Sequence, residues 1–373
     1  FQMNQTSEDG EPKKSEDGEP KRRRWSVLFV SGIPQHIHPS VVKKHLSQAF
    51  VPFNVKRVTT SGYGDKHSRT RGFAHVSVRQ EDDAALAIRA LDGILQIEDT
   101  TLSVSRTTGR CDTLFSNLPY ATRGQLKLDE TAFFSVTDSV TADWVAKCIF
   151  AICSALVPNA SDLVVTDATA CAGGNVMGLC RIFCRINAVE IDEQRCDDLK
   201  YNISLCGFES KVRVEHGNCM ELVSGLQQDI ICLDPPWGGQ SYSKKEVMTD
   251  ILFDNQPLAD VCAYVMGFCG ILALKLPFNF NLDDLVKKMV DIAVISHKEV
   301  PWPFKMEFGR TVVVVFCRKT DRLPFSLPLL ESVIASIVTW NTNLGKQHHP
   351  AFYDWDKHQW VPLSRWHFKS TKT

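Results

Sequence analysis

The spacing of hydrophobic residues between Trp25 and Thr107 switches between a period of two, typical of strands, and a helical period. The expected elements follow in the order strand, helix, strand, strand, helix, strand. They cover residues 27–30, 39–49, 55–60, 72–78, 81–91 and 102–105. This order is that of the split βαβ arrangement, so we expect a small α+β, ferredoxin-like domain over residues 25–110.

The next part of the chain alternates apolar strand-like runs with helical patterns. A helix is expected over residues 141–156, and strands are expected from Leu163 onward and over residues 186–191, 211–215 and 229–233. This alternation predicts an α/β fold, a Rossmann-like doubly wound parallel sheet, over residues 131–320. Residues 111–130 are expected to be a linker.

The two ends of the chain have a different character. A tandem repeat without apolar residues, Ser7–Lys13 and Ser15–Lys21, predicts a disordered leader over residues 1–24. The basic run Lys21–Arg24 is either a nuclear address or a phosphate-attracting flank of the next domain. The C-terminal extension, residues 321–373, carries Trp340, Trp355, Trp360 and Trp366 among basic residues, which favours core packing over an RNA clamp.

Composition narrows the class of protein. With 373 residues, 44% of them hydrophobic, the chain can build two packed domains, and a fibrous protein is excluded. We see no apolar run approaching the length of about 18 residues that spans a bilayer, so no membrane partner is expected. The 13 cysteines form no Cys-x-x-Cys pair, and His348, His349, His358 and His367 lack ligand spacing. A reducing compartment and no bound metal are therefore expected.

Charge is unevenly distributed along the chain. The total net charge is -1, but residues 21–110 carry +8 and residues 111–317 carry -9. A basic module beside an acidic one indicates that the first contacts a polyanion such as RNA. The alternative is that these charges only keep two surfaces solvated.

Two segments of the N-terminal domain, Leu28–Ile33 and Arg71–Val78, resemble the signature segments of an RNA recognition motif. The resemblance implies that Phe29 and Phe73 stack on unpaired bases while Arg71 contacts the RNA backbone. His75 stands where the family usually has a further aromatic residue. A ferredoxin-like domain that binds protein instead stays open.

A donor-binding turn is indicated where the strand from Leu163 ends. Asp167 is followed by Gly173 and Gly174, small residues that allow backbone amides to approach a ligand closely. Glu190 comes near the end of the next strand, where a carboxylate can take both hydroxyls of a ribose. Asn218 follows the third strand and would lie near an adenine ring.

The segment Asp234-Pro235-Pro236-Trp237 follows the fourth strand and indicates amine methylation. A carboxylate and a prolyl carbonyl can accept the two N–H groups of an exocyclic amine and aim its lone pair at a methyl donor. Consecutive prolines make that geometry rigid. Trp237 offers a face for the base, where a cationic 7-methylguanine gains roughly 0.5–2 kcal/mol.

Residues from about Gly124 to Arg318 resemble the trimethylguanosine synthase family, S-adenosylmethionine-dependent RNA cap guanine-N2 methyltransferases. The matching segments are Lys127–Asp129, Phe134–Thr137, Asp167–Asn175, Glu190–Asp192, Pro235–Gly239 and, more weakly, Leu276–Asn279. The resemblance implies that S-adenosylmethionine is held by Thr137, Asp167, Gly173, Gly174, Asn175, Glu190, Asn218 and Asp234. It also implies that Asp234, Pro235 and Trp237 are catalytic.

Two positions depart from that family's pattern. Cys171 stands at a usual glycine of the donor loop, and Phe278 stands at an arginine that would grip the cap phosphates. Lys275, Lys244 or Lys245 are candidates for the missing phosphate contact.

The leading interpretation is an enzyme that methylates the guanine N2 amine of 7-methylguanosine caps on small nuclear or related RNAs. Ribonucleoprotein proteins are further candidate partners, and a nuclear site is expected. Adenine-N6 methylation of RNA and a noncatalytic RNA-binding protein with a methyltransferase fold are the alternatives. The oligomeric state does not follow from the sequence.

Overall fold

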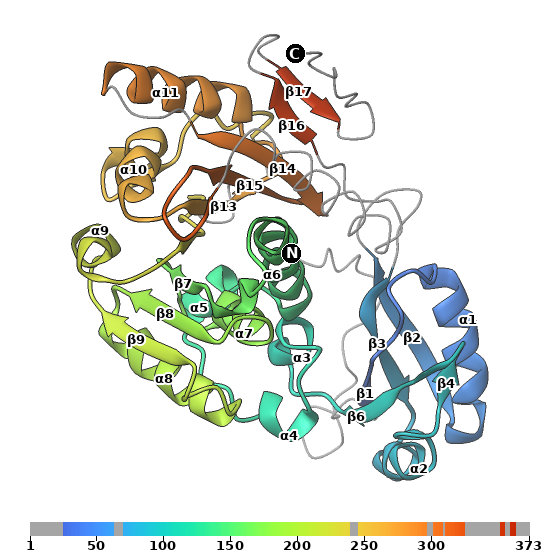
Figure 1. The fold of residues 1–373 in the computed structure, drawn as a ribbon. Helices are drawn as coiled ribbons and strands as arrows, with labels where there is room; N and C mark the ends of the chain where they lie inside the picture. The colour runs from blue at the N-terminus through green and yellow to red at the C-terminus, as the bar shows by residue number, and fades with distance from the viewer. Residues whose placement is uncertain are drawn as a thin grey trace. The chain divides into compact units, whose positions relative to one another are not determined.

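The computed structural model describes residues 25–62, 70–238, 245–296, 301–308, 310–324, 351–354 and 359–362. The chain divides into two compact units, residues 1–107 and 108–373, here called the N-terminal and C-terminal units (Figure 1). The expected leader with its basic run, Lys244, and the tail residues Trp340, Trp355, Trp366 and the four tail histidines lie outside the described residues.

The N-terminal unit has a four-stranded antiparallel sheet in the order β2-β3-β1-β6, with two helices (Figure 1). This confirms the expected split βαβ arrangement. Its elements are β1 (Ser26–Ser31), α1 (Pro39–Ala49), the 3-10 helix Val51–Phe53, β2 (Val55–Gly62), β3 (Thr70–Val78), α2 (Glu81–Leu91), β4 (Gln96–Ile97), β5 (Thr100–Thr101) and β6 (Ser103–Arg106).

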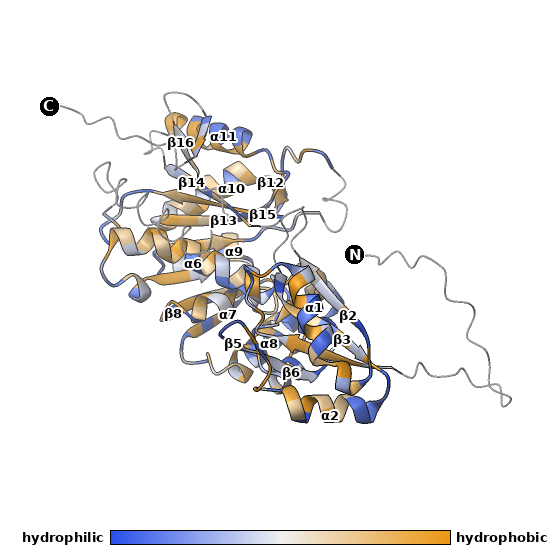
Figure 2. Ribbon diagram, turned by 90° about the vertical axis from the view of Figure 1, so that its right-hand side faces the viewer, coloured by the Kyte–Doolittle hydropathy of each residue, from blue (hydrophilic) through white to orange (hydrophobic). Residues whose placement is uncertain are grey.

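Both helices of this unit begin and end where the sequence predicts. Pro39 starts α1, and the His38 side chain accepts a hydrogen bond from the Ser40 backbone. Gln80 and Asp83 form a reciprocal capping box at the start of α2. Both helices carry hydrophobic and hydrophilic residues (Figure 2), and their apolar side packs on Leu28 and Val30 of the sheet.

The C-terminal unit is built on one nine-stranded sheet in the order β17-β16-β14-β15-β13-β10-β7-β8-β9. Its described strands are β7 (Val164–Asp167), β8 (Arg185–Glu190), β9 (Val212–His216), β10 (Ile230–Leu233), β13 (Ile271–Pro277), β14 (Trp302–Phe308), β15 (Thr311–Cys317), β16 (Ala351–Asp354) and β17 (Gln359–Pro362). Strands β10, β7, β8 and β9 run parallel, as expected, and β13, which was not among the expected strands, continues the parallel part of the sheet. The antiparallel strands beyond β13 were not predicted.

Helices cover both faces of this sheet. One apolar core joins α6, α7 and α8 to one face, and a second joins α9, α10 and α11 to the other. The remaining elements are α3 (Arg110–Leu114), α4 (Tyr120–Arg123), α5 (Glu130–Ser135), α6 (Ser139–Leu156), α7 (Gly174–Cys180), α8 (Glu193–Leu205), α9 (Cys219–Leu222), β11 (Leu252–Phe253), β12 (Gln256–Pro257), α10 (Leu258–Val265), α11 (Leu282–Ile295) and the 3-10 helices Ala160–Asp162, Val223–Gly225 and Met266–Phe268.

Residues 111–130 are not a linker, which corrects the expected domain boundary. Phe115 lies in the core of the C-terminal unit. Arg123 and Asp112 form a buried ion pair, with 3.0 Å between Nε and Oδ1. A buried charge must be paired, so this short polar stretch is held against the C-terminal unit by contacts that its composition does not reveal.

Helix α6 is long and apolar enough, by length and composition alone, to cross a membrane. This run of 18 residues corrects the expectation that no apolar run approaches the length that spans a bilayer. Of its apolar window, 67% is buried inside the C-terminal unit, where the helix packs against the sheet. Such burial is that of a core helix.

Part of the expected C-terminal extension belongs to the sheet. Strand β16 pairs with β14, and β17 pairs with β16. The Trp360 ring lies 5.3 Å from the ring of Tyr353, and Lys305 Nζ lies 5.3 Å from the Trp360 ring centroid. Trp360 therefore packs within the unit, as its composition favoured.

Candidate active site

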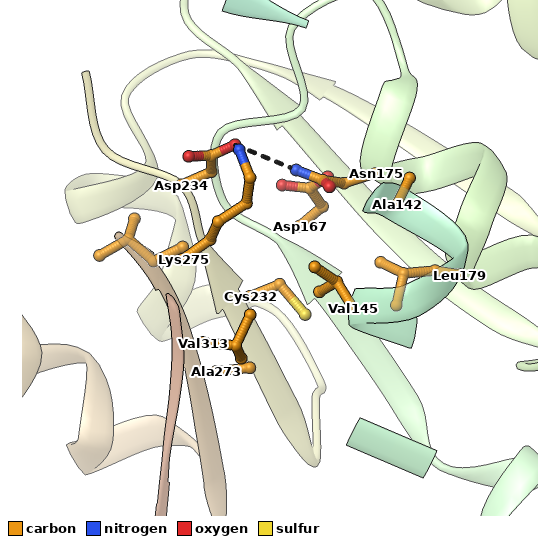
Figure 3. Close-up of a pocket in the computed structure, with 11 residues that line it drawn as sticks. Ala142, Val145, Asp167, Asn175, Leu179, Cys232, Asp234, Ala273, Lys275 and Val313 are labelled. Atoms are coloured by element: carbon orange, nitrogen blue, oxygen red, sulfur yellow. Dashed lines mark hydrogen bonds and ion pairs between the residues drawn. The ribbon is translucent and has the colours of Figure 1, made fainter. Parts of the chain in front are cut away.

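The predicted chemical motifs follow the carboxyl ends of β7, β8 and β10, three neighbouring parallel strands. In a parallel sheet these ends share one edge, which is where open α/β sheets bind ligands. Figure 3 shows Asp167, Asn175, Asp234 and Lys275 converging on a small pocket there. The apolar lower wall is formed by residues of α6, α7 and β15, among others.

Asp234 is the centre of the polar contacts in the pocket. Its Oδ2 accepts three hydrogen bonds, from Lys275 Nζ at 2.6 Å, Thr137 Oγ1 at 3.0 Å and Asn175 Nδ2 at 3.3 Å. Its backbone N–H donates to Thr169 Oγ1 at 2.9 Å. The expected site residues Thr137, Asn175 and Asp234 are thus brought together from three separate segments.

Asp167 is buried at the floor of this pocket, with 1% of its surface exposed. Its Oδ1 accepts the Thr169 N–H at 3.2 Å, whereas Oδ2 has no hydrogen-bond partner in the described part of the chain. Burial raises the pKa of Asp167 to about 7, helped by the charges of Asp234 and Glu190 and opposed by the Thr169 hydrogen bond and Lys275. An unpaired buried carboxylate is suited to a cationic ligand group.

The turn after β7 is held by close packing. Gly174 begins α7, and a Cβ there would lie 2.3 Å from the carbonyl oxygen of Thr137. Cys171 has a φ of +48°, in the left-handed region that favours glycine. This explains why a glycine is usual at that position. Burial raises the pKa of the Cys171 thiol to about 12, so it is no thiolate nucleophile.

Glu190 ends β8 and is almost fully buried. Its Oε2 accepts the Cys171 N–H at 2.9 Å, and Oε1 accepts from the Asp192 N–H at 3.0 Å and from Arg195 Nε at 3.2 Å. Arg195 also contacts Asp129 at 3.4 Å. The Glu190 carboxylate is therefore fixed at the strand end, partly by Arg195, which was not among the site residues predicted from the sequence.

Asn218 is engaged in the fold. Its Oδ1 caps α9 by accepting the Met220 N–H at 2.9 Å, and its Nδ2 donates to Asp254 Oδ2 at 3.0 Å. The structure thus gives Asn218 a helix-capping role at the place where the sequence predicts an adenine contact.

Trp237 packs on the second apolar core and is partly exposed. Lys275 Nζ lies 4.7 Å from its ring centroid. Lys275 is only 9% exposed, and its ammonium group is already paired with Asp234 and lies near the Trp237 ring, contacts that the predicted role at RNA phosphates did not include. The sequence signal for this pairing with a buried carboxylate is a single lysine inside an otherwise apolar strand, Ile271–Pro277.

The RNA-binding residues expected in the N-terminal unit lie together on one face of its sheet. The rings of Phe29 and Phe73 are 5.5 Å apart, and that of His75 is 5.4 Å from Phe29. The Arg71 guanidinium lies 5.7 Å from the Phe73 ring. Neither Phe29 nor Phe73 belongs to the apolar core of this unit, which Leu28 and Val30 join from the other face of the sheet. The stacking of both rings on RNA bases stays a prediction.

The position of the missing family arginine is occupied by an exposed Phe278. The Arg310 guanidinium lies 5.3 Å from the Phe278 ring centroid, and the Phe278 N–H donates to the Arg310 carbonyl. Lys245, a further candidate, is exposed at the edge of a segment outside the described residues.

Two family models match the chain. Residues 163–317 match the RNA cap guanine-N2 methyltransferase family, and residues 28–103 match the RNA recognition motif. Trimethylguanosine synthase of Schizosaccharomyces pombe is 29% identical over 173 residues, 42% of this chain and 65% of that protein. An uncharacterised protein of Acanthamoeba polyphaga mimivirus is 34% identical over 126 residues, 32% of this chain and 48% of that protein. The chain thus spans about half to two thirds of these relatives.

Solved structures give weaker likenesses. An O-methyltransferase from Bacillus cereus has 11% identity and a TM-score of 0.33, covering 54% of this chain and 86% of that one. The Sxl-lethal protein in complex with RNA has 25% identity and a TM-score of 0.19, covering 22% and 47%. The family matches and the sheet order agree on one assignment: residues 163–317 form a domain of the RNA cap guanine-N2 methyltransferase family, whose members are S-adenosylmethionine-dependent, and residues 28–103 form an RNA recognition motif.

Proposed function

We propose that this protein methylates the N2 amine of guanine in the 7-methylguanosine cap of an RNA. The observation that carries the proposal is the state of Asp234, at the end of β10 before Pro235, Pro236 and Trp237. One carboxylate oxygen is held by three donors, while no hydrogen bond to the other is present among the described residues. That leaves an acceptor for an amine N–H.

The residues present fit S-adenosylmethionine. The unpaired Oδ2 of Asp167 suits its ammonium group, Glu190 lies at the strand end where a carboxylate can take ribose hydroxyls, and the Gly173–Gly174 turn starts a helix beside them. Bound there, S-adenosylmethionine would supply an electrophilic methyl group, with its sulfur as the leaving group.

The protein's own residues orient the acceptor. Asp234 Oδ1 and the Pro235 carbonyl accept the two N–H hydrogens of the amine, so that its lone pair forms the new bond to carbon. The surplus proton on nitrogen then passes to Asp234 Oδ1. Trp237 stacks on the base, and the two prolines keep the acceptor groups in place. The RNA recognition motif holds the body of the RNA.

The proposal is tested by incubating the purified full chain with labelled S-adenosylmethionine and three RNAs: 7-methylguanosine-capped, unmethylated-capped and uncapped. Label in the guanine N2 position of the first RNA is expected. Label in adenine of the uncapped RNA would instead identify an adenine-N6 methyltransferase. Binding without label in any RNA would identify a noncatalytic RNA-binding protein.

Asp234→Ala sharpens this test. Loss of orientation alone exceeds a hundredfold in rate, so methyl transfer should fall at least that far. Donor affinity should change little, because the pocket retains Asp167 and Glu190. Equilibrium binding of S-adenosylmethionine and single-turnover rates separate the two effects. The exposed Asp260→Asn is the control, and near-normal turnover by Asp234→Ala would contradict the assigned role.

A further inference from the structure

Lys275 is the one charged residue in the strand Ile271–Pro277, and each of the seven residues of this strand is buried. A buried lysine is costly unless its ammonium group is paired. The parallel register of β10 and β13 places Leu233 beside Leu274, so that the next residues, Asp234 and Lys275, adjoin. Their side chains are 13% and 11% exposed, and Nζ lies 2.6 Å from Oδ2.

The three donors around the Asp234 carboxylate all contact the same oxygen. Lys275 Nζ, Thr137 Oγ1 and Asn175 Nδ2 all donate to Oδ2 of Asp234. Figure 3 shows the other oxygen of this carboxylate pointing away from Asn175 and Lys275. Three donors on one oxygen fix the rotation of the carboxylate and direct Oδ1 alone toward an acceptor amine.

The same ammonium group also fixes the base platform. Nζ lies 4.7 Å from the centroid of the Trp237 ring, within the range of a cation–π contact. Lys275 therefore links the carboxylate that orients the amine to the ring that supports the base. A base stacked on Trp237 then uses the ring face opposite to Lys275.

We propose that Lys275 is a positioning residue for methyl transfer: through Asp234 Oδ2 and the Trp237 ring it sets the angle at which the acceptor amine meets the donor methyl. The proposal rests on the function proposed above. It assigns Lys275 no contact with substrate phosphate, since its charge is already paired in a buried site. Because protein groups about 1 Å out of place cost about a hundredfold in rate, the contribution is measurable.

The first test compares Lys275→Met with Lys275→Arg in the full chain. Met retains the length of the side chain and removes the charge, so kcat should fall about a hundredfold while the affinity for S-adenosylmethionine changes less than about threefold. Arg retains a charge and donors, so it should restore at least a tenth of the wild-type kcat. Lys287→Met, exposed on α11, is the matched control and should leave kcat unchanged.

The second test covers the case in which Lys275→Met does not fold because it leaves Asp234 unpaired. Asp234→Ser leaves Lys275 as the unpaired charge, and Asp234→Ser with Lys275→Met removes both charges. In the double variant no buried charge is left without a partner at this position. The double variant should therefore be at least tenfold more active than Asp234→Ser alone.

The outcomes separate the two proposals. A wild type that methylates capped RNA, with Lys275→Met equally active, overturns the role of Lys275 and leaves the function standing. A double variant no more active than Asp234→Ser does the same. A wild type inert with all three RNAs overturns both.

Discussion

At the scale of single residues, the carboxylates at the strand ends differ in how far the structure has already satisfied them. Asp234 and Glu190 each accept three hydrogen bonds. Asp167 accepts one and keeps a buried oxygen unpaired. Of these three carboxylates, Asp167 is therefore the one whose ionisation a bound cation would favour most.

Donor affinity should therefore depend on pH through Asp167. Because its pKa is raised to about 7, the carboxylate is mostly protonated at pH 6 and mostly ionised at pH 8. A cationic donor should bind about tenfold more tightly at pH 8 than at pH 6. Calorimetric titration of S-adenosylmethionine at both values measures this, and Asp167→Asn should flatten the difference, whereas Asp260→Asn should preserve it.

The unliganded domain should show the opposite trend in stability. The folded protein binds a proton at Asp167 up to about pH 7, whereas the ordinary pKa is 3.8. The contribution of Asp167 to the free energy of unfolding is therefore lost as the pH rises from about 4 to 7. Tighter donor binding at high pH without this loss in the wild type would contradict Asp167 as the titrating group.

The sequence predicted residues whose chemistry is local and missed those whose role depends on register. Asp167, Glu190 and Asp234 follow strands that can be recognised by their apolar runs, and all three lie at the expected edge. Lys275 was expected to contact phosphate, because nothing in the sequence shows that β13 lies beside β10.

At the scale of elements, helix bounds with clear caps were predicted to the residue, as for α1 and α2. The antiparallel strands β14 and β15 were missed because a short apolar run without a motif does not show which strand it pairs with or in which direction. Helices α3 and α4 were taken for linker because their anchors, Phe115 and the Arg123–Asp112 pair, look like ordinary loop residues in sequence.

The start of α7 should be the least tolerant element boundary in the site. A methyl group on Gly174 would meet the Thr137 carbonyl at 2.3 Å and Val136 Cγ2 at 2.7 Å. Gly174→Ala must therefore move the segment that carries Thr137, a donor to Asp234. We expect a loss of about 1–3 kcal/mol in stability, the usual cost of overpacking, together with reduced methyl transfer.

Chemical denaturation and initial rates check both parts of this prediction. Gly225→Ala is the control, because no atom lies within 4 Å of a Cβ there. If Gly174→Ala matched Gly225→Ala in stability and rate, the close packing of α7 on Thr137 would not position the site.

At the scale of the whole molecule, basic charge is gathered in the N-terminal unit and the methylation motifs in the acidic C-terminal unit. Substitution of Phe29 and Phe73 by alanine would remove the packing of the two rings on each other as well as any stacking on RNA bases. Exposed charges are the better probe of RNA recruitment. Lys56 and Arg57 on β2 are both exposed.

Reversal of these two charges, Lys56→Glu with Arg57→Glu, should weaken binding of capped single-stranded RNA and make its salt dependence shallower. Two lost phosphate contacts reduce the slope of log K against log salt by about 1.4. Filter binding across a salt series measures it. Lys200→Glu with Lys287→Glu, both exposed in the C-terminal unit, is the matched control. Identical slopes for the wild type and the β2 variant would favour a protein-docking role for the N-terminal unit.

The pairing of β16 with β14 has a practical consequence for handling the protein. The family match ends at residue 317, before β16 and β17. A protein expressed only to that point would retain every motif for methyl transfer but leave the outer edge of β14 without its partner at Phe304 and Lys305. Open strand edges pair with other chains, so such a fragment is prone to aggregate. The final strands therefore protect solubility.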